Sequence, residues 1–248
     1  MNNEPLISVI TVTYNAASVI DKTMKSLDIQ TFKDFEHLVI DGKSKDDTLK
    51  IINHFSLPQT HIISESDKGL YDAMNKGLRL AKGKFVLFLN AGDAFHSNDT
   101  LSNYAEQAKK NADIIYGDTV IVSPEGEVLG PRHLSVPDKL TNKSFANGML
   151  ICHQAFMIKK ELASEYNLRY RFSADYDWCI RSIKKSNPSK RINLNQVTIE
   201  YLSEGLTDKN KWKSLRERFK IMSHHYGFIP TLFNHFRFVI RAATRGSI

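Results

Sequence analysis

The segment from Glu65 to Asp93, ESDKGLYDAMNKGLRLAKGKFVLFLNAGD, constrains the fold more than any other part of the chain. Its apolar residues from Leu70 to Ala81 recur every three or four positions, which predicts a helix with one buried face. Asp67 stands where the cap of that helix is expected. After a lysine-rich turn, Lys84 to Leu89 is an apolar run typical of a strand that is buried on both faces.

This strand ends in a polar tip, Asn90-Ala91-Gly92-Asp93. Open α/β sheets bind their ligands at the carboxyl ends of central parallel strands, so we expect chemistry at the tip. The small residues Ala91 and Gly92 allow the backbone to approach a ligand, and Asp93 offers a hard oxygen ligand for Mg²⁺ or Mn²⁺ beside phosphate oxygens. The alternative is a tight turn whose aspartate bonds its own backbone.

Two strand–helix pairs precede this unit. Leu6 to Thr13 is a β-branched run typical of a buried strand, and Asn15 is a suitable cap for a helix with an apolar stripe from Val19 to Leu27. Phe35 to Ile40 predicts a second strand, which ends at Asp41. The fold class is therefore α/β, with a mainly parallel Rossmann-like central sheet flanked by helices. The chain has no G-x-G-x-x-G motif, which argues against a dinucleotide-binding enzyme.

Together, the runs ISVITVTYN and DGKSKDDT and the Glu65–Asp93 segment resemble the family 2 glycosyltransferases, whose fold is called GT-A; the similarity spans roughly residues 6–180. The resemblance implies a hexosyltransferase-type enzyme that moves a sugar from a nucleotide-sugar donor to a glycan or lipid-linked acceptor, in the assembly of bacterial surface polysaccharides. In that family an Asp-x-Asp element at the tip holds a divalent cation, Mn²⁺ or Mg²⁺, and the donor diphosphate. Asp93 would be the metal ligand here, and Asn90 replaces the first acid.

The resemblance also implies a nucleoside pocket at the ends of the first two strands. Thr13 and Asn15 would line it, or would serve only as a turn and a helix cap. Asp41 would accept a hydrogen bond from the base, or would only fix the turn after it. Within that turn, Ser44-x-x-Asp47 is typical of a capping box that opens the next helix.

Further substrate-binding candidates follow from the same resemblance. Asn75 matches an asparagine of the family's Ala-Arg-Asn segment, in which Met74 here replaces the arginine. Asp67 and Asn90 are candidates beside it. His153 lies in a stretch expected to be an apolar strand, where it is either a core histidine or a contact to the substrate.

A second polar feature, Asp175 with Asp177, opens an apolar helical stripe. The first turn of a helix favours a carboxylate, because its charge complements the positive end of the helix dipole. The family places its catalytic general base in a Glu-Asp pair at this point, so the resemblance implies that Asp175 is the base, with Ala174 in place of the glutamate. Asp177 lies about 200° further round the helix, where we expect it to pair with Arg181.

Two segments are candidate covers of the site. No periodicity is sustained from Pro131 to Gly148, and a segment of this length without structure is either mobile or functional, so we interpret it as a candidate lid. Leu202 to Thr207 is expected to form a turn that closes over the donor site.

The positive charge of the chain lies at its C-terminal end. From Lys209 to Ile248 there are nine Lys and Arg against one acidic residue, whereas the whole chain has a net charge of +7. Two apolar helical stripes run through the same region, which predicts a basic amphipathic helical tail over residues 206–248 after a GT-A domain over residues 1–205. Such a tail either lies on a membrane surface or packs on protein.

We expect the protein in the cytoplasm or peripherally at the inner face of the cell membrane, because no signal segment or long apolar run is found and only two cysteines occur. Two other functions stay open. The changes at Asn90 and Ala174 allow a catalytically silent GT-A-like module that binds a glycan or a partner. The basic tail suggests a nucleic-acid-binding protein, but the near-neutral body argues against it, so no nucleic acid is expected. The donor sugar, its base, the acceptor and the oligomeric state cannot be predicted from the sequence.

Overall fold

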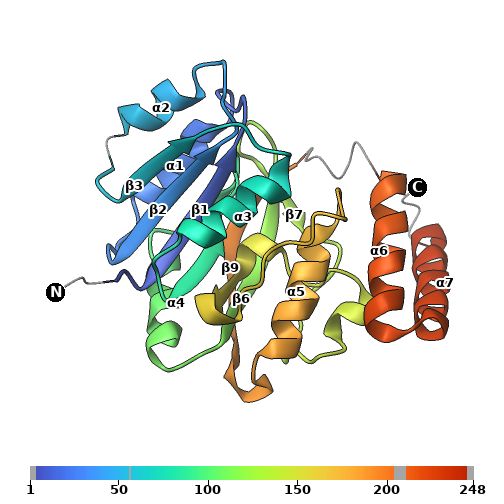
Figure 1. Cartoon of the computed structure of the whole chain (residues 1–248). Helices are drawn as coiled ribbons and strands as arrows, with labels where there is room; N and C mark the ends of the chain where they lie inside the picture. Colours follow the sequence, from blue (N-terminus) through green and yellow to red (C-terminus); the bar gives the residue numbers. More distant parts are fainter. Residues whose placement is uncertain (1–3, 56, 204–210, 245–248) are drawn as a thin grey trace.

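The chain forms a mixed α/β fold around one sheet (Figure 1). The structure is a computed structural model that describes residues 4–55, 57–203 and 211–244. Its sheet has nine strands in the order β3-β2-β1-β4-β8-β6-β9-β5, with β7 paired to β6 outside this path. The α/β class predicted from the sequence is confirmed.

The N-terminal half of the sheet is parallel and consists of β1 (Ile7–Thr13), β2 (Phe35–Asp41), β3 (Thr60–Ser64) and β4 (Phe85–Phe88). Every residue of β1, β2 and β4 is buried, as expected for apolar strands covered on both faces. Helices α1 (Ile20–Asp28) and α2 (Thr48–His54) pack on one face, and α3 (Leu70–Leu80) packs on the other. A Cβ on Gly77 of α3 would lie 2.4 Å from Ile10 Cγ2, so the glycine permits the close approach of α3 to the sheet.

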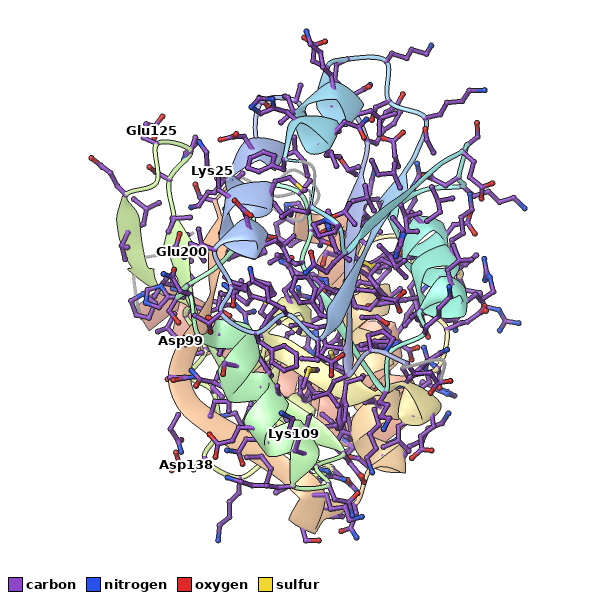
Figure 2. All side chains as sticks on the ribbon, turned by 90° about the vertical axis from the view of Figure 1, so that its left-hand side faces the viewer. Lys25, Asp99, Lys109, Glu125, Asp138 and Glu200 are labelled. Atoms are coloured by element: carbon purple, nitrogen blue, oxygen red, sulfur yellow. The ribbon has the colours of Figure 1, made fainter. Side chains whose placement is uncertain are left out.

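The second half of the sheet has mixed directions. It consists of β5 (Ala94–Phe95), β6 (Ile114–Val122), β7 (Val128–Pro131), β8 (Phe156–Lys159) and β9 (Arg191–Leu202). Strand β8 runs antiparallel to both β4 and β6, while β6 and β9 are parallel. Helix α4 (Thr100–Lys109) crosses one side of the molecule from Asp99 to Lys109 (Figure 2), and α5 (Ala174–Lys185) lies on the side of α3. Four 3₁₀ turns connect these elements: η1 (Ser144–Asn147), η2 (His153–Ala155), η3 (Lys160–Leu162) and η4 (Pro188–Lys190).

The predicted helical tail forms two helices, α6 (Lys211–Tyr226) and α7 (Phe228–Thr244). They lie side by side next to α5, at the end of the molecule opposite β3 (Figure 1). Among the described helices, none combines the length and the hydropathy needed to cross a bilayer. The predicted closing turn at 202–207 lies largely outside the described residues.

Several local predictions are wrong, because the side chains concerned make other contacts than the expected ones. Helix α3 begins after Gly69, and Asp67 bonds the Gly69 N–H at 2.7 Å instead of capping the helix directly. The capping box does not form, since the Ser44 hydroxyl donates to Asp41. His153 lies in η2 and not in a strand.

The segment from Pro131 to Gly148 is largely irregular, as predicted, but its second half is packed against the body. Tyr116 donates to the Pro137 carbonyl at 3.1 Å, and Arg191 donates to the Leu140 carbonyl at 3.1 Å. Phe145 is fully buried. These contacts hold residues 137–145 in place, so this half is not a free lid.

Candidate active site

The tip after β4 is held by α1 and by the end of β9. The Thr23 hydroxyl of α1 accepts the Gly92 N–H at 2.9 Å and donates to the Asp93 carbonyl at 2.8 Å. Gly92 has φ +96°, and a Cβ there would lie 2.8 Å from a Leu202 methyl group. The small residue is therefore needed for the turn and for packing against β9.

Asp93 is only 5 % exposed, and its Oδ1 accepts the Leu202 N–H at 2.8 Å. Burial raises the pKa of its carboxyl to about 6, although the Leu202 N–H, the Gln154 side chain and the charges of His153 and Lys22 lower it. Lys22 itself pairs with Glu200 of β9 at 3.0 Å, on the side of the molecule seen in Figure 2. Asp93 is thus a carboxylate that the fold buries with only partial charge compensation.

His153 connects this tip with the start of α5. Its Nδ1 lies 3.6 Å from Asp175 Oδ2, and its Nε2 lies 3.5 Å from the side-chain nitrogen of Asn90. Burial alone would lower the pKa of His153, but the contact with Cys152 and the charges of Asp175 and Asp93 raise it overall. The two aspartates that the resemblance assigns to metal and base therefore share one neighbour, although they are far apart in the sequence.

Asp175 lies in the first turn of α5, with 17 % of its side chain exposed. Its Oδ1 accepts the Tyr71 O–H at 3.0 Å, and its Oδ2 faces His153. Burial and the charge of Asp175 raise the pKa of Tyr71 well above its ordinary value, so the phenol stays protonated and can only donate to the carboxylate. Asp175 is thus held from two sides and remains in contact with solvent.

Asp177 lies two residues further on and faces away from this site. It is 3 % exposed, and it bonds Arg181 Nε at 2.7 Å and His225 Nε2 of α6 at 2.7 Å. The predicted pairing of Asp177 with Arg181 is confirmed.

The residues at the tip fit a divalent cation. The Asn90 Oδ1 atom is buried without a hydrogen-bond partner among the described residues, and the carboxyl of Asp93, three residues further on in the same turn, is short of positive charge. Both offer hard oxygen ligands. Within the described parts of the chain, no group of three or more His, Cys, Asp or Glu side chains forms a complete cage. A cation here would therefore take its other ligands from phosphate and water, as Mg²⁺ commonly does.

The predicted nucleoside residues gather at the carboxyl ends of β1 and β2, where Thr13 pairs with Asp41 in the register. The Thr13 hydroxyl oxygen is buried and has no partner among the described residues. Asn15 has φ +47°, and its Oδ1 accepts the Lys45 N–H at 2.8 Å. Asp41 accepts hydrogen bonds from Ser44 and from the Ser64 hydroxyl, the latter at 2.6 Å. Thr13 is the one of these three that has an unused buried polar atom.

Asn75 and Asp67 both make internal contacts. Asn75 exchanges two hydrogen bonds with the Tyr166 backbone, at 3.0 and 2.6 Å, and is 2 % exposed. Asp67 is half-buried, and a Cβ on Gly42 would lie 2.6 Å from its Oδ2. Asp67 therefore lies close to the turn after β2, whereas Asn75 lies where α3 meets the segment before α5.

Three residues near the site were not predicted from the sequence. Tyr71 donates to Asp175. The side-chain oxygen of Gln154 accepts the Asn90 N–H at 2.7 Å. Arg132 has a buried Nη1 without a partner among the described residues, and its charge acts on Cys152 and Tyr201. Tyr71 belongs to the buried stripe of α3, and only knowledge of which helix packs beside it could reveal its role.

The family model of glycosyl transferase family 2 matches residues 8–166. A PGL/p-HBAD biosynthesis glycosyltransferase of Mycobacterium bovis is 39% identical over 208 residues, which cover 81% of this chain and 77% of the relative. A UDP-Glc:alpha-D-GlcNAc-diphosphoundecaprenol beta-1,3-glucosyltransferase of Escherichia coli is 28% identical over 220 residues, covering 88% and 85%. The chain therefore belongs to glycosyl transferase family 2 and is a glycosyltransferase.

Solved structures agree on the fold. S. aureus TarS is similar with a TM-score of 0.70 at 18% identity, over 94% of this chain and 72% of TarS. Glucosyl-3-phosphoglycerate synthase from Mycobacterium tuberculosis, solved with Mn²⁺ and UDP, gives a TM-score of 0.64 at 13% identity, over 90% and 80%. The fold is thus GT-A, as the resemblance implied.

Proposed function

We propose that this enzyme is an inverting glycosyltransferase that moves a sugar from a nucleotide-sugar donor to a hydroxyl of a glycan or lipid-linked acceptor. One observation carries the proposal: His153 lies 3.6 Å from Asp175 and 3.5 Å from Asn90 of the tip. A general base and the residues beside the donor diphosphate must act on the two sides of one sugar, so the reaction requires them to lie close together.

In this reaction Asp175 accepts the proton of the acceptor hydroxyl while the hydroxyl oxygen attacks the anomeric carbon. The bond from that carbon to the diphosphate oxygen breaks as the new bond forms on the opposite face, and the nucleoside diphosphate leaves. One displacement inverts the anomeric centre. Tyr71 holds Asp175 Oδ1 at 3.0 Å, so we assign the proton to Oδ2.

Asp93 would hold the divalent cation, Mn²⁺ or Mg²⁺, together with the amide oxygen of Asn90. When bound, such a cation neutralises the diphosphate and the charge that develops on the leaving group. The unpartnered Asn90 Oδ1 and the raised pKa of Asp93 support this assignment. The Mn²⁺ and UDP in the structure of the mycobacterial synthase support it at the level of the family.

Thr13, Asn15 and Asp41 would contact the nucleoside. The unpartnered Thr13 hydroxyl oxygen supports the first contact. Asp41 already accepts hydrogen bonds from Ser44 and Ser64. An N–H of the base would be a further donor to the same carboxylate. The remaining substrate-binding candidates are Asp67, Asn75 and His153.

A surface polysaccharide is the product that the family resemblance implies. The Escherichia coli relative is named for UDP-glucose and a diphosphoundecaprenol-linked acceptor. We propose a lipid-linked acceptor of this chemical kind, and with it a place in the cytoplasm at the inner face of the cell membrane. The helical tail over residues 206–248 would touch that membrane, because large apolar side chains are exposed on both α6 and α7.

The substitution Asp175→Asn tests the proposed base. It should lower turnover by about 10²–10⁴-fold, because an amide cannot take up the proton, and it should leave nucleotide binding nearly unchanged. Turnover is measured with a panel of nucleotide sugars, starting from UDP-glucose, in the presence of Mn²⁺ and a diphosphate-linked GlcNAc acceptor. If the variant turns over like the wild type, Asp175 is not the base. If the wild type transfers no sugar from any donor of the panel, the inverting-transfer proposal fails as well.

A further inference from the structure

Glu217 is the only acidic residue between Lys209 and Ile248, and it points into the body of the enzyme. Its two carboxylate oxygens accept three consecutive backbone N–H groups, those of Arg171 at 2.9 Å, Phe172 at 2.8 Å and Ser173 at 3.0 Å. Hydrogen bonds from N–H groups to a carboxylate are about twice as strong as neutral ones. One side chain of the tail thus fixes three residues that directly precede α5.

This contact holds the segment that leads into α5, a helix without a side-chain cap of its own. Ser173 is the N-cap residue of α5, but its side chain makes no capping bond. Its hydroxyl is instead hydrogen-bonded to the Ser214 hydroxyl of α6, at 2.9 Å. The segment that leads into α5 is therefore attached to α6 by both Glu217 and Ser214.

Asp175 lies two residues after Ser173, in the first turn of α5. A shift of the preceding backbone would move the Asp175 carboxylate relative to Tyr71 and His153, which hold it at 3.0 and 3.6 Å. A misplacement of about 1 Å at a catalytic group can cost about 10²-fold in rate.

We infer that Glu217 is a positioning residue of the active site, through which helix α6 sets the orientation of Asp175. The tail is then part of the catalytic unit and not only an attachment. The inference rests on the proposed role of Asp175 as general base.

The test compares Glu217→Ala and Glu217→Gln with the wild-type enzyme in full-length form, well below their melting temperatures. Alanine removes all three hydrogen bonds and should lower kcat about tenfold or more, with little change in the KM for the donor. Glutamine keeps one acceptor oxygen and should recover part of the loss. Hydrogen exchange should be faster at the amides of residues 171–175 in the alanine variant.

Lys184→Met is the matched control for a general loosening of α6. Lys184 lies at the other end of α5, where it donates to the His225 carbonyl of α6 at 3.1 Å, far from Asp175. The kcat of the Lys184→Met variant should stay at the wild-type value. The inference about Glu217 would be overturned if Glu217→Ala kept the wild-type kcat, or if Lys184→Met lost as much kcat as Glu217→Ala. Either result would leave the proposed base intact as long as Asp175→Asn shows its expected loss of turnover. An active Asp175→Asn would instead refute the proposed base itself.

Discussion

Asp93 carries a carboxyl group that is 5 % exposed and has a pKa of about 6, raised from 3.8 by burial. Between about pH 4 and pH 6 the folded protein binds more protons at this group than the unfolded chain does. Stability therefore falls as the pH rises through this range, by about 2–3 kcal/mol in total. The ionised Asp93 carboxyl therefore lowers the stability of the folded protein, which fits its proposed role as a metal ligand.

Asp93→Asn should therefore stabilise the metal-free enzyme. In EDTA at pH 7.5 we expect the free energy of unfolding to rise by about 1–3 kcal/mol, because the amide keeps an acceptor for the Leu202 N–H and carries no charge. At pH 4 most of the gain should vanish, since the wild-type carboxyl is then protonated. Urea unfolding at both pH values measures the difference. A variant that is less stable than the wild type at pH 7.5 would contradict this reading of Asp93.

Helix α5 separates two carboxylates by its own geometry. Asp175 faces the sheet edge, while Asp177, about 200° round the helix, faces α6. The sequence was sufficient to predict this division and the Arg181 partner, because both depend on positions within one helix. It could not predict that His225 of α6 also binds Asp177, since that contact joins residues 48 apart.

The same distinction explains the other outcomes. Apolar periodicity predicted α3, β4 and α5, because each buries a continuous face of its own sequence. The contacts that build the site join distant residues: Tyr71 and Asp175 are 104 apart, and Asp93 and Leu202 are 109 apart. The resemblance pointed to the aspartates, but the side chains that hold them depend on how the strands are ordered in the sheet.

Asp177→Asn should weaken the attachment of α6 to α5. The pKa of Asp177 is lowered, because the His225 and Arg181 hydrogen bonds outweigh its burial. Its contribution to stability is therefore present above about pH 4 and is lost as the pH falls through the lowered pKa. At pH 7 we expect a loss of about 3 kcal/mol in the free energy of unfolding.

Urea unfolding at pH 7 and pH 3 checks this, and the difference between variant and wild type should shrink at pH 3. The matched control is Asp21→Asn, which removes an exposed pair with Lys25 on α1. That change should cost less than about 1 kcal/mol at either pH. Equal losses in the two variants would show that the buried pairing has no special role.

At the scale of the whole molecule, the exposed large apolar side chains are concentrated on one side. Half of those found in the described residues belong to α6 and α7: Trp212, Leu215, Phe228, Ile229, Leu232, Phe233 and Phe236. The five on α7 fall within one broad helical face. From Lys209 to Ile248 the chain also has nine basic residues against one acidic residue. An apolar face within a basic segment is suited to an anionic lipid surface.

Vesicle sedimentation tests this surface. The wild-type protein should bind vesicles of anionic phosphatidylglycerol more than vesicles of neutral phosphatidylcholine, and added salt should weaken the binding. Phe233→Ser with Phe236→Ser should lower the bound fraction several-fold. The control pair is Val128→Ser with Leu129→Ser, which removes exposed apolar side chains from β7 and should change little. No binding to either vesicle, with self-association instead, would mean that the surface meets a second copy of the chain.

In the proposed mechanism, Asp93 and Asp175 serve one bound donor in different roles. Calorimetric titration of UDP and of GDP, each with Mn²⁺, into the wild type, Asp93→Asn and Asp175→Asn separates the two roles. We expect the wild type and Asp175→Asn to bind the same nucleotide with similar affinity, while Asp93→Asn should lose the Mn²⁺-dependent part of the binding. Unchanged, Mn²⁺-dependent binding by Asp93→Asn would contradict it.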